Sequence, residues 1–192
     1  AGKPREDKVL DVAEAAALEG WIVDDPARAN ELWKIRADGA GLASVSLDDP
    51  AYGGWEDAAV PPQHLGDYLR EFDALLERHG LHGLPYGHFG DGCVHCRIDF
   101  PLTAPDGAQR YRDFVEEAAA LVARFGGSMS GEHGDGRARS ALLPHMYSPA
   151  ALGIFAQVKH IFDPRGLLNP GVLVDPAPVT QDLRMVAASR SP

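Results

Sequence analysis

A short segment near the middle of the chain constrains the fold more than any other part of the sequence. Residues 85–100 read PYGHFGDGCVHCRIDF, with Asp91-Gly92 between two stretches that can extend. An Asp-Gly pair in this setting is typical of a two-residue β-hairpin turn. The sequence therefore predicts a hairpin here, and with it an antiparallel sheet rather than a parallel one.

Segments with the patterns of helices and strands surround this hairpin. Helices are expected where apolar residues recur at helical spacing or where proline follows an N-capping aspartate, at 6–19, 26–37, 63–79, 107–125 and, with a break near Ser148, 137–162. Short strands are expected at 21–24 and 55–60, and loops at 38–54 and 126–136. This order predicts an α+β fold in which an antiparallel, ferredoxin-like sheet is covered by helices on one face.

The length and composition of the chain fit one domain with a short tail. The chain has 192 residues, of which 45% are hydrophobic, so it can bury a core. We expect the domain to cover residues 1–175. Residues 176–192 are polar and contain several prolines, and they are expected to form a linker or tail.

Charge and cysteine content exclude several classes of function. A net charge of −10 argues against a general nucleic-acid binder, which needs a basic surface. No run of about 18 apolar residues is present, so no membrane span is expected. Two cysteines cannot form a disulfide framework, and a reducing, cytoplasmic setting is expected. Strand alternation places Cys93 and Cys96 on opposite faces, which favours structural thiols over a metal-binding or redox pair.

The predicted hairpin also brings two imidazoles together. If Asp91-Gly92 forms the turn, His88 and His95 lie directly opposite each other, with Cβ atoms about 4.5–5.5 Å apart. Two imidazoles at that separation can bind one metal ion. Arg97 lies on the same face as His95, where its cation could bind a substrate carboxylate. The alternative is a solvated hairpin surface without a ligand.

A second cluster of polar residues lies in a glycine-rich loop, residues 130–136, which reads SGEHGDG. Glu132 can complete a site of two histidines and one carboxylate, with positions left open for substrate or water. His133 would then be able to accept a proton, because the usual pKa of histidine lies near neutrality. A simple turn is the alternative for this pair taken alone. Two such clusters in one short chain favour the metal site.

Three motifs, in this order, resemble a known family. GHFGDGCVH (87–95), SGEHGDGR (130–137) and FDPRGLLNPG (162–171) are similar to segments of the C-terminal domain of FAD-linked oxidases. That family includes glycolate oxidase, D-lactate dehydrogenase and D-2-hydroxyglutarate dehydrogenase. The likeness covers roughly residues 5–175 and is greatest to the long branch in which an iron–sulfur region follows on the same chain. It implies a substrate- and metal-binding cap for a separate FAD domain that precedes it, inactive when isolated.

The resemblance also implies roles for individual residues. His88, His95 and Glu132 would hold a divalent metal, for which zinc is expected. His133 would take the proton of the substrate hydroxyl while hydride passes to FAD. Arg36 is expected to bind the substrate carboxylate, and Asn169 is expected to lie near the flavin.

Three positions depart from the family pattern. Cys93, directly after Gly92, stands where relatives often carry an asparagine. Arg97 stands where relatives often carry an asparagine that contacts substrate. The strand expected at WEDAAV has Trp55-Glu56 where several relatives carry a substrate-binding lysine. Arg97 could replace the charge of that lysine and favour a diacid.

The sequence thus predicts the substrate-binding domain of a flavin-dependent dehydrogenase. Its substrate would be a small 2-hydroxy acid such as D-lactate, glycolate or D-2-hydroxyglutarate, oxidised to the 2-keto acid. Electrons would leave through an iron–sulfur region or a quinone, with peripheral membrane association through that acceptor. Two alternatives stay open: a metal-dependent hydrolase that activates water at His88, His95 and Glu132, and a non-catalytic domain that docks on a flavin domain.

Overall fold

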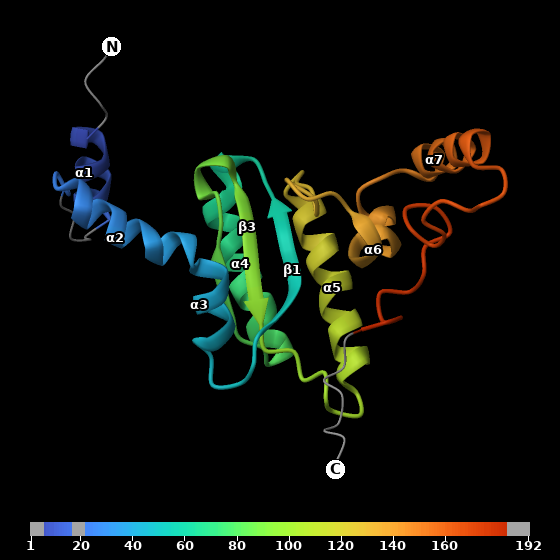
Figure 1. The fold of residues 1–192 in the computed structure, drawn as a ribbon, viewed down its shortest axis with the longest axis horizontal. Helices are drawn as coiled ribbons and strands as arrows, with labels where there is room; N and C mark the ends of the chain where they lie inside the picture. Colours follow the sequence, from blue (N-terminus) through green and yellow to red (C-terminus); the bar gives the residue numbers. More distant parts are fainter. Residues whose placement is uncertain (1–5, 17–21, 184–192) are drawn as a thin grey trace. The chain divides into compact units, whose positions relative to one another are not determined.

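A computed structural model describes residues 6–16 and 22–183 in two compact units, 1–39 and 40–192 (Figure 1). The first unit contains α1 (Glu6–Ala15) and α2 (Pro26–Ala37), close to the helices expected there. The strand expected at 21–24 is wrong for residues 22–24, which have no regular structure, and residue 21 lies outside the described residues. These residues instead lead into the cap of α2, where the Asp25 carboxylate accepts the Ala27 N–H at 3.1 Å.

The second unit is built on a three-stranded antiparallel sheet with the order β1-β3-β2. A helix separates β1 from β2 and another follows β3, and an antiparallel bridge between Ala59 and Ser128 stands where a fourth strand would lie beside β1. This is a ferredoxin-like order with the last strand reduced to one bridge, so the α+β prediction is confirmed. The elements are α3 (Gly39–Val45), β1 (Tyr52–Ala59), η1 (Pro62–His64), α4 (Leu65–His79), β2 (Gly83–Tyr86), η2 (Phe89–Asp91), β3 (Cys93–Ile98), α5 (Gly107–Arg124), α6 (Gly136–Arg139), η3 (Ser140–His145) and α7 (Pro149–Phe162).

The hydrophobic core lies between the sheet and the two long helices. Helices α4 and α5 were expected from their apolar faces, and these faces supply buried residues such as Phe72 and Phe114. Val94, Cys96 and Ile98 of β3 belong to the same core. Because side chains alternate along a strand, the residues between them, including His95, point to the other face of the sheet.

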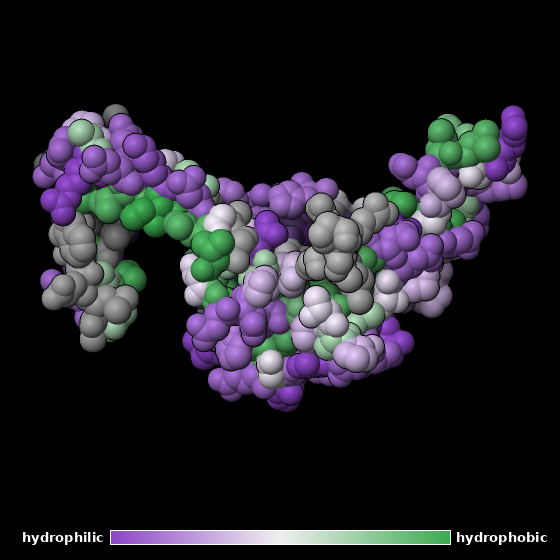
Figure 2. Space-filling view, turned by 60° about the horizontal axis from the view of Figure 1, so that its bottom comes forward, coloured by the Kyte–Doolittle hydropathy of each residue, from purple (hydrophilic) through white to green (hydrophobic). Residues whose placement is uncertain are grey.

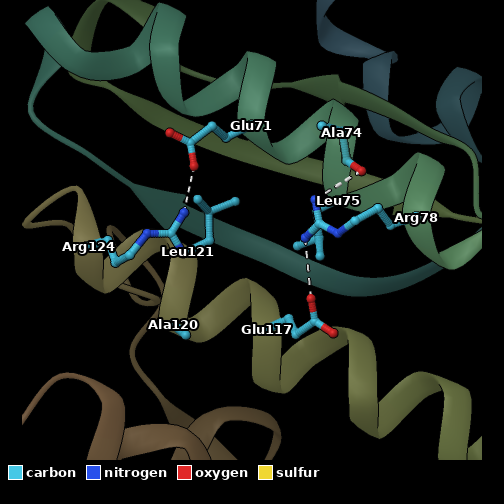
Figure 3. Close-up of a pocket in the computed structure, with 8 residues that line it drawn as sticks. All are labelled: Glu71, Ala74, Leu75, Arg78, Glu117, Ala120, Leu121 and Arg124. Atoms are coloured by element: carbon cyan, nitrogen blue, oxygen red, sulfur yellow. Dashed lines mark hydrogen bonds and ion pairs between the residues drawn. The ribbon is translucent and has the colours of Figure 1, made fainter.

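A shallow groove runs between α4 and α5 and is crossed by two ion pairs (Figure 3). Arg78 of α4 lies 3.3 Å from Glu117 of α5, and Arg124 of α5 pairs with Glu71 of α4. All four side chains are at least half exposed, so each pair contributes at most about 1 kcal/mol. We interpret this groove, of about 170 Å³, as a packing seam between the helices.

Strands β2 and β3 form the expected antiparallel pair, but the expected turn and register are wrong. Tyr86, rather than His88, is the partner of His95. The connection spans residues 87–92 and contains the 3-10 turn η2, instead of a two-residue turn. The carbonyl of His88 accepts the N–H groups of Asp91, at 2.9 Å, and Cys93, at 3.1 Å. His88 therefore lies in the loop and does not face His95 across the sheet.

Gly92 allows this loop to pack against the chain before α4. Its φ is +77°, and a Cβ there would lie 1.9 Å from the Val60 carbonyl oxygen. We expect Gly92→Ala to lower the free energy of unfolding by about 3 kcal/mol, because left-handed strain adds to a backbone clash. Urea unfolding of the purified chain measures this loss. Gly90→Ala is the matched control, since a Cβ there meets no atom within 4 Å. Equal losses in the two variants would contradict the argument.

Three segments outside the sheet differ from the expectation. The loop expected at 38–54 contains α3 and the start of β1. Ala43 of α3 is buried, and the nearby glycines, which have low helix propensity, hid this helix from the sequence pattern. The helix expected at 137–162 is divided into α6, η3 and α7. Its expected break is confirmed at Ser148, whose Oγ caps α7 by accepting the Ala151 N–H. Val179, beyond the expected domain end, packs in the core.

No helix within residues 6–16 and 22–183 has both the length and the apolar character needed to cross a membrane.

Candidate functional site

Four polar side chains converge on the face of the sheet opposite the helical core. Asp57 comes from β1, His95 from β3, and Glu132 and His133 from the loop after α5. Each offers one ligand atom, and these atoms all lie within 4.8 Å of one another. The structure thus brings together three of the residues that sequence analysis singled out, and it adds Asp57.

Asp57 organises this cluster from a buried position in β1. The residue is fully buried, and its carboxylate accepts the backbone N–H of Glu132 at 2.8 Å and of His133 at 2.7 Å. Its own N–H donates to Nδ1 of His95 at 3.0 Å, and its carbonyl accepts the N–H of Gly131 at 2.9 Å. One residue therefore fixes both the glycine-rich loop and the imidazole on the neighbouring strand.

The backbone of Asp57 is itself unusual. Its φ is +77°, and the β1–β3 register shifts on each side of Trp55, between Gly53 and Ala58. These irregularities allow Glu56 and Asp57, which are consecutive in the chain, both to contact His95. Asp57 was not among the residues predicted from the sequence. An aspartate inside the strand pattern WEDAAV was a usable signal, because a buried charge is rarely left unpaired.

The three histidines near the loop occupy different positions. The rings of His95 and His133 stack, with centroids 5.1 Å apart and planes 12° apart. His88 lies outside the four-residue cluster, but its Nε2 is 3.7 Å from Oε1 of Glu132. The two predicted histidine ligands, His88 and His95, thus both lie near the carboxylate of Glu132, the third predicted ligand. Imidazole and carboxylate donors of this kind suit a divalent cation such as zinc.

A second carboxylate stands behind His95. Oε2 of Glu56 lies 3.6 Å from Nδ1 of His95, and the ring of Tyr86 lies 5.4 Å from the imidazole between centroids. Nδ1 of His95 already accepts the Asp57 N–H, so Glu56 lies beside the ring as a negative charge and makes no hydrogen bond to that nitrogen.

The two cysteines lie on opposite faces of β3, as the alternation predicted. Sγ of Cys93 is 3.7 Å from Oδ1 of Asp57, whereas Cys96 belongs to the helical core. Burial, followed by the negative charges of Glu132 and Asp57, raises the pKa of the Cys93 thiol to about 12, and burial raises the pKa of Cys96 as well. Thiols that stay protonated near neutrality are poor nucleophiles and poor ligands.

Arg97, expected to meet a substrate carboxylate, is engaged by a carboxylate of its own chain. Its Nε lies 3.3 Å from Oε1 of Glu56, and the Tyr86 hydroxyl donates to Oε2 of Glu56 at 3.2 Å. Burial and then the charge of Glu56 raise the pKa of the Tyr86 phenol. The cation beside His95 is therefore compensated within the domain.

The remaining predicted residues lie away from this cluster or outside the described side chains. Arg36 is in α2 of the first unit, and its side chain lies outside the described residues. Asn169 is exposed, with φ +44°, and lines an apolar hollow of about 410 Å³ with residues of α7 such as Phe155 and Val158.

The segment that carries Asn169 is shaped by Asp163 at the end of α7. The Asp163 carboxylate pairs with Nζ of Lys159 at 2.6 Å and accepts the N–H groups of Leu167 at 2.9 Å and Leu168 at 2.8 Å. The Lys159 contact, followed by these backbone hydrogen bonds, lowers the pKa of the Asp163 carboxyl to about 2. The motif FDPRGLLNPG thus forms an ordered turn with Leu167 and Leu168 exposed.

Comparison with known proteins decides the family. Residues 3–173 match the model of the FAD linked oxidases, C-terminal domain. The chain belongs to this family. The predicted family is confirmed, and two of the three motifs on which the prediction rested, 87–95 and 130–137, contribute residues to the cluster.

Several relatives are named dehydrogenases of 2-hydroxy acids. The chain is 41% identical over 127 residues to D-2-hydroxyglutarate dehydrogenase of Escherichia coli (strain K12), covering 63% of this chain and 12% of that protein. It is 36% identical over 118 residues to D-lactate dehydrogenase of Archaeoglobus fulgidus, covering 62% and 26%. It is 34% identical over 155 residues to probable mitochondrial D-lactate dehydrogenase of Danio rerio, covering 81% and 31%. The chain therefore matches between 12% and 31% of the length of these relatives.

Proposed function

We propose that this chain is the substrate-binding domain of a flavin-dependent dehydrogenase that oxidises a 2-hydroxy acid to the 2-keto acid. The observation that carries the proposal is the convergence of Asp57, His95, Glu132 and His133 within 4.8 Å, in a member of the FAD-linked oxidase family. Relatives named D-lactate dehydrogenase and D-2-hydroxyglutarate dehydrogenase support this substrate class, and glycolate belongs to it chemically.

The cluster suits the chemistry of a hydroxy acid. In this proposal His88, His95 and Glu132 hold a divalent metal, zinc by donor type, which supplies a Lewis acid for the hydroxyl and carboxylate oxygens of the substrate. His133 accepts the hydroxyl proton, and its place beside His95 supports that role. FAD, held mainly by a separate domain, supplies the hydride acceptor. Arg36 is proposed to bind the substrate carboxylate, for which a guanidinium fork is suited.

The surface around α7 supports docking of the flavin domain. Figure 2 shows hydrophobic side chains gathered on α7, and Ile161 and Phe162 at its end are 71% and 81% exposed. Leu167 and Leu168 of the following turn are also exposed, and Asn169 lies next to them. Apolar surface of this kind marks interaction sites. We infer that Asn169 faces the flavin domain. We also propose that the protein is cytoplasmic, in a reducing compartment. Its electrons would leave through an iron–sulfur region or through a quinone at the membrane surface.

Metal binding is the first test of this function. The purified chain, loaded with zinc at neutral pH and dialysed, is expected to retain about one equivalent. His88→Ala is expected to lose most of this zinc, whereas His145→Ala should keep it, because His145 pairs with Glu116 beside α5. Retention of less than about a tenth of an equivalent by the unsubstituted chain would contradict a preformed site.

Substrate oxidation is tested in the intact flavoprotein. D-lactate, glycolate and D-2-hydroxyglutarate are each mixed with it without oxygen, and bleaching of the flavin absorbance is followed. At least one of the three is expected to bleach the flavin, and His88→Ala should abolish most of that rate. Bleaching by none of them would contradict the proposal, and flavin-independent ester or amide hydrolysis by the chain would favour the metal-dependent hydrolase instead.

A further inference from the structure

We infer that the Glu56–Arg97 ion pair makes this site selective for 2-hydroxy acids with one carboxylate and rejects those with a second, distal carboxylate. The inference rests on the proposed function and deepens it. Glu56 of β1, Tyr86 of β2 and Arg97 of β3 lie on the same side of the sheet as His95. They form the wall beside the cluster that would hold the α-hydroxycarboxylate.

The cation in this wall is already compensated. Oε1 of Glu56 and Nε of Arg97 lie 3.3 Å apart, and their side chains are 23% and 30% exposed. The same two atoms are buried and make no hydrogen bond to the described residues, so each depends on the charge of the other. In a low-dielectric setting an ion pair of this kind is costly to separate, because the carboxylate left behind keeps its charge without a partner.

The surrounding strands hold the pair in place. Tyr86 donates its hydroxyl proton to Glu56 at 3.2 Å from the β2 side. On the β1 side Gly53 is the register partner of Arg97, and a Cβ there would lie 2.8 Å from a terminal guanidinium nitrogen of Arg97 and 3.1 Å from Oε1 of Glu56. Glycine at this position therefore leaves room for the pair beside β1, and a larger residue would displace the two side chains.

A distal carboxylate meets an unfavourable choice at this wall. It must either displace Glu56 from Arg97, which leaves Glu56 unpaired, or approach Arg97 while Glu56 stays in place as a like charge. A short, uncharged substituent such as the methyl group of D-lactate or the hydrogen of glycolate meets neither obstacle. The pair thus favours a monocarboxylate, although some relatives of this chain are named D-2-hydroxyglutarate dehydrogenase.

The test compares two substrates in the intact flavoprotein. kcat/KM is measured for D-lactate and D-2-hydroxyglutarate at one ionic strength, and the ratio is expected to favour D-lactate by at least about tenfold. Glu56→Gln keeps the shape and removes the charge, so Arg97 becomes available and the ratio should move toward the diacid by about tenfold or more. The ratio is the readout because both substrates share the α-hydroxycarboxylate, and any effect through His95 on the metal is common to both.

Two further variants separate charge from a general disturbance. Adding Arg97→Gln to Glu56→Gln removes the cation that Glu56→Gln leaves without its carboxylate. The double variant should therefore lose the increase in relative kcat/KM for D-2-hydroxyglutarate. Glu71→Gln is the matched control, since it breaks an Arg–Glu pair in the helical layer and should leave the ratio unchanged. Binding of pyruvate relative to 2-oxoglutarate, read from the flavin absorbance, is expected to change among the variants in the same direction as the kcat/KM ratio.

The outcomes are distinct for the two proposals. If the wild-type protein prefers D-2-hydroxyglutarate to D-lactate, the inference is overturned without any variant. An unchanged ratio of the two kcat/KM values in Glu56→Gln overturns it as well. Either result leaves the dehydrogenase activity established. If neither acid bleaches the flavin and no other 2-hydroxy acid does, the proposed function fails, and the inference that rests on it falls with it.

Discussion

Asp57→Ala is expected to lower the free energy of unfolding of the chain by about 4 kcal/mol and to prevent zinc retention. The carboxylate accepts two backbone N–H groups, at 2.8 and 2.7 Å, and hydrogen bonds to charged groups contribute about 1.5–3 kcal/mol each. Removing it leaves both donors without their partner in a partly buried setting. It also places an alanine at φ +77°, a conformation that alanine adopts less readily than aspartate.

Two milder substitutions at Asp57 separate these causes. Asp57→Asn tolerates the positive φ but presents an amide nitrogen to one of the two donors, so about half of the loss is expected. Asp57→Gly relieves the backbone strain and loses both hydrogen bonds, which places it between asparagine and alanine. Urea unfolding and zinc content after dialysis measure the series. Asp73→Asn, at an exposed position of α4, is the control, and an equal loss there would show that Asp57 has no special role.

The parts of the fold that could be predicted are those with a repeated local pattern. The helices expected at 63–79 and 107–125 are present as α4 and α5, because an apolar stripe at helical spacing must be buried whatever it packs against. The register of β2 and β3 could not be read in the same way. Asp91-Gly92 looks like a tight turn, but the loop is shaped by contact of Gly92 with Val60, a residue that the turn itself does not contain.

The site shows the same limit. The hairpin and loop patterns, and then the resemblance, indicated His95, Glu132 and His133, which the structure brings together. Neither indicated Asp57, whose carboxylate binds backbone groups 75 and 76 residues further along the chain. Nor did either indicate that Arg97 is compensated by Glu56, since the register shifts in β1 change which residues of that strand reach β3. Relations of this kind depend on strand pairing and leave no local pattern.

The second large effect is expected at His133. In the intact flavoprotein His133→Ala should lower the rate of flavin reduction by D-lactate about 10²–10⁴-fold, the range over which a positioned general base contributes. The structure supports this role because the backbone of His133 is held by Asp57, while its side chain is exposed and stacks on His95. Stopped-flow absorbance of the flavin measures the rate directly.

Metal content and chemical rescue distinguish a base from a ligand. If His133 accepts the proton, His133→Ala keeps its zinc, and added imidazole restores part of the rate because a small base can enter the space that the side chain leaves. His88→Ala, by contrast, should lose zinc together with rate and should not respond to imidazole. Loss of zinc in His133→Ala, without rescue, would instead make His133 a ligand, alongside the other members of the cluster within 4.8 Å. Another group would then have to accept the proton of the substrate hydroxyl.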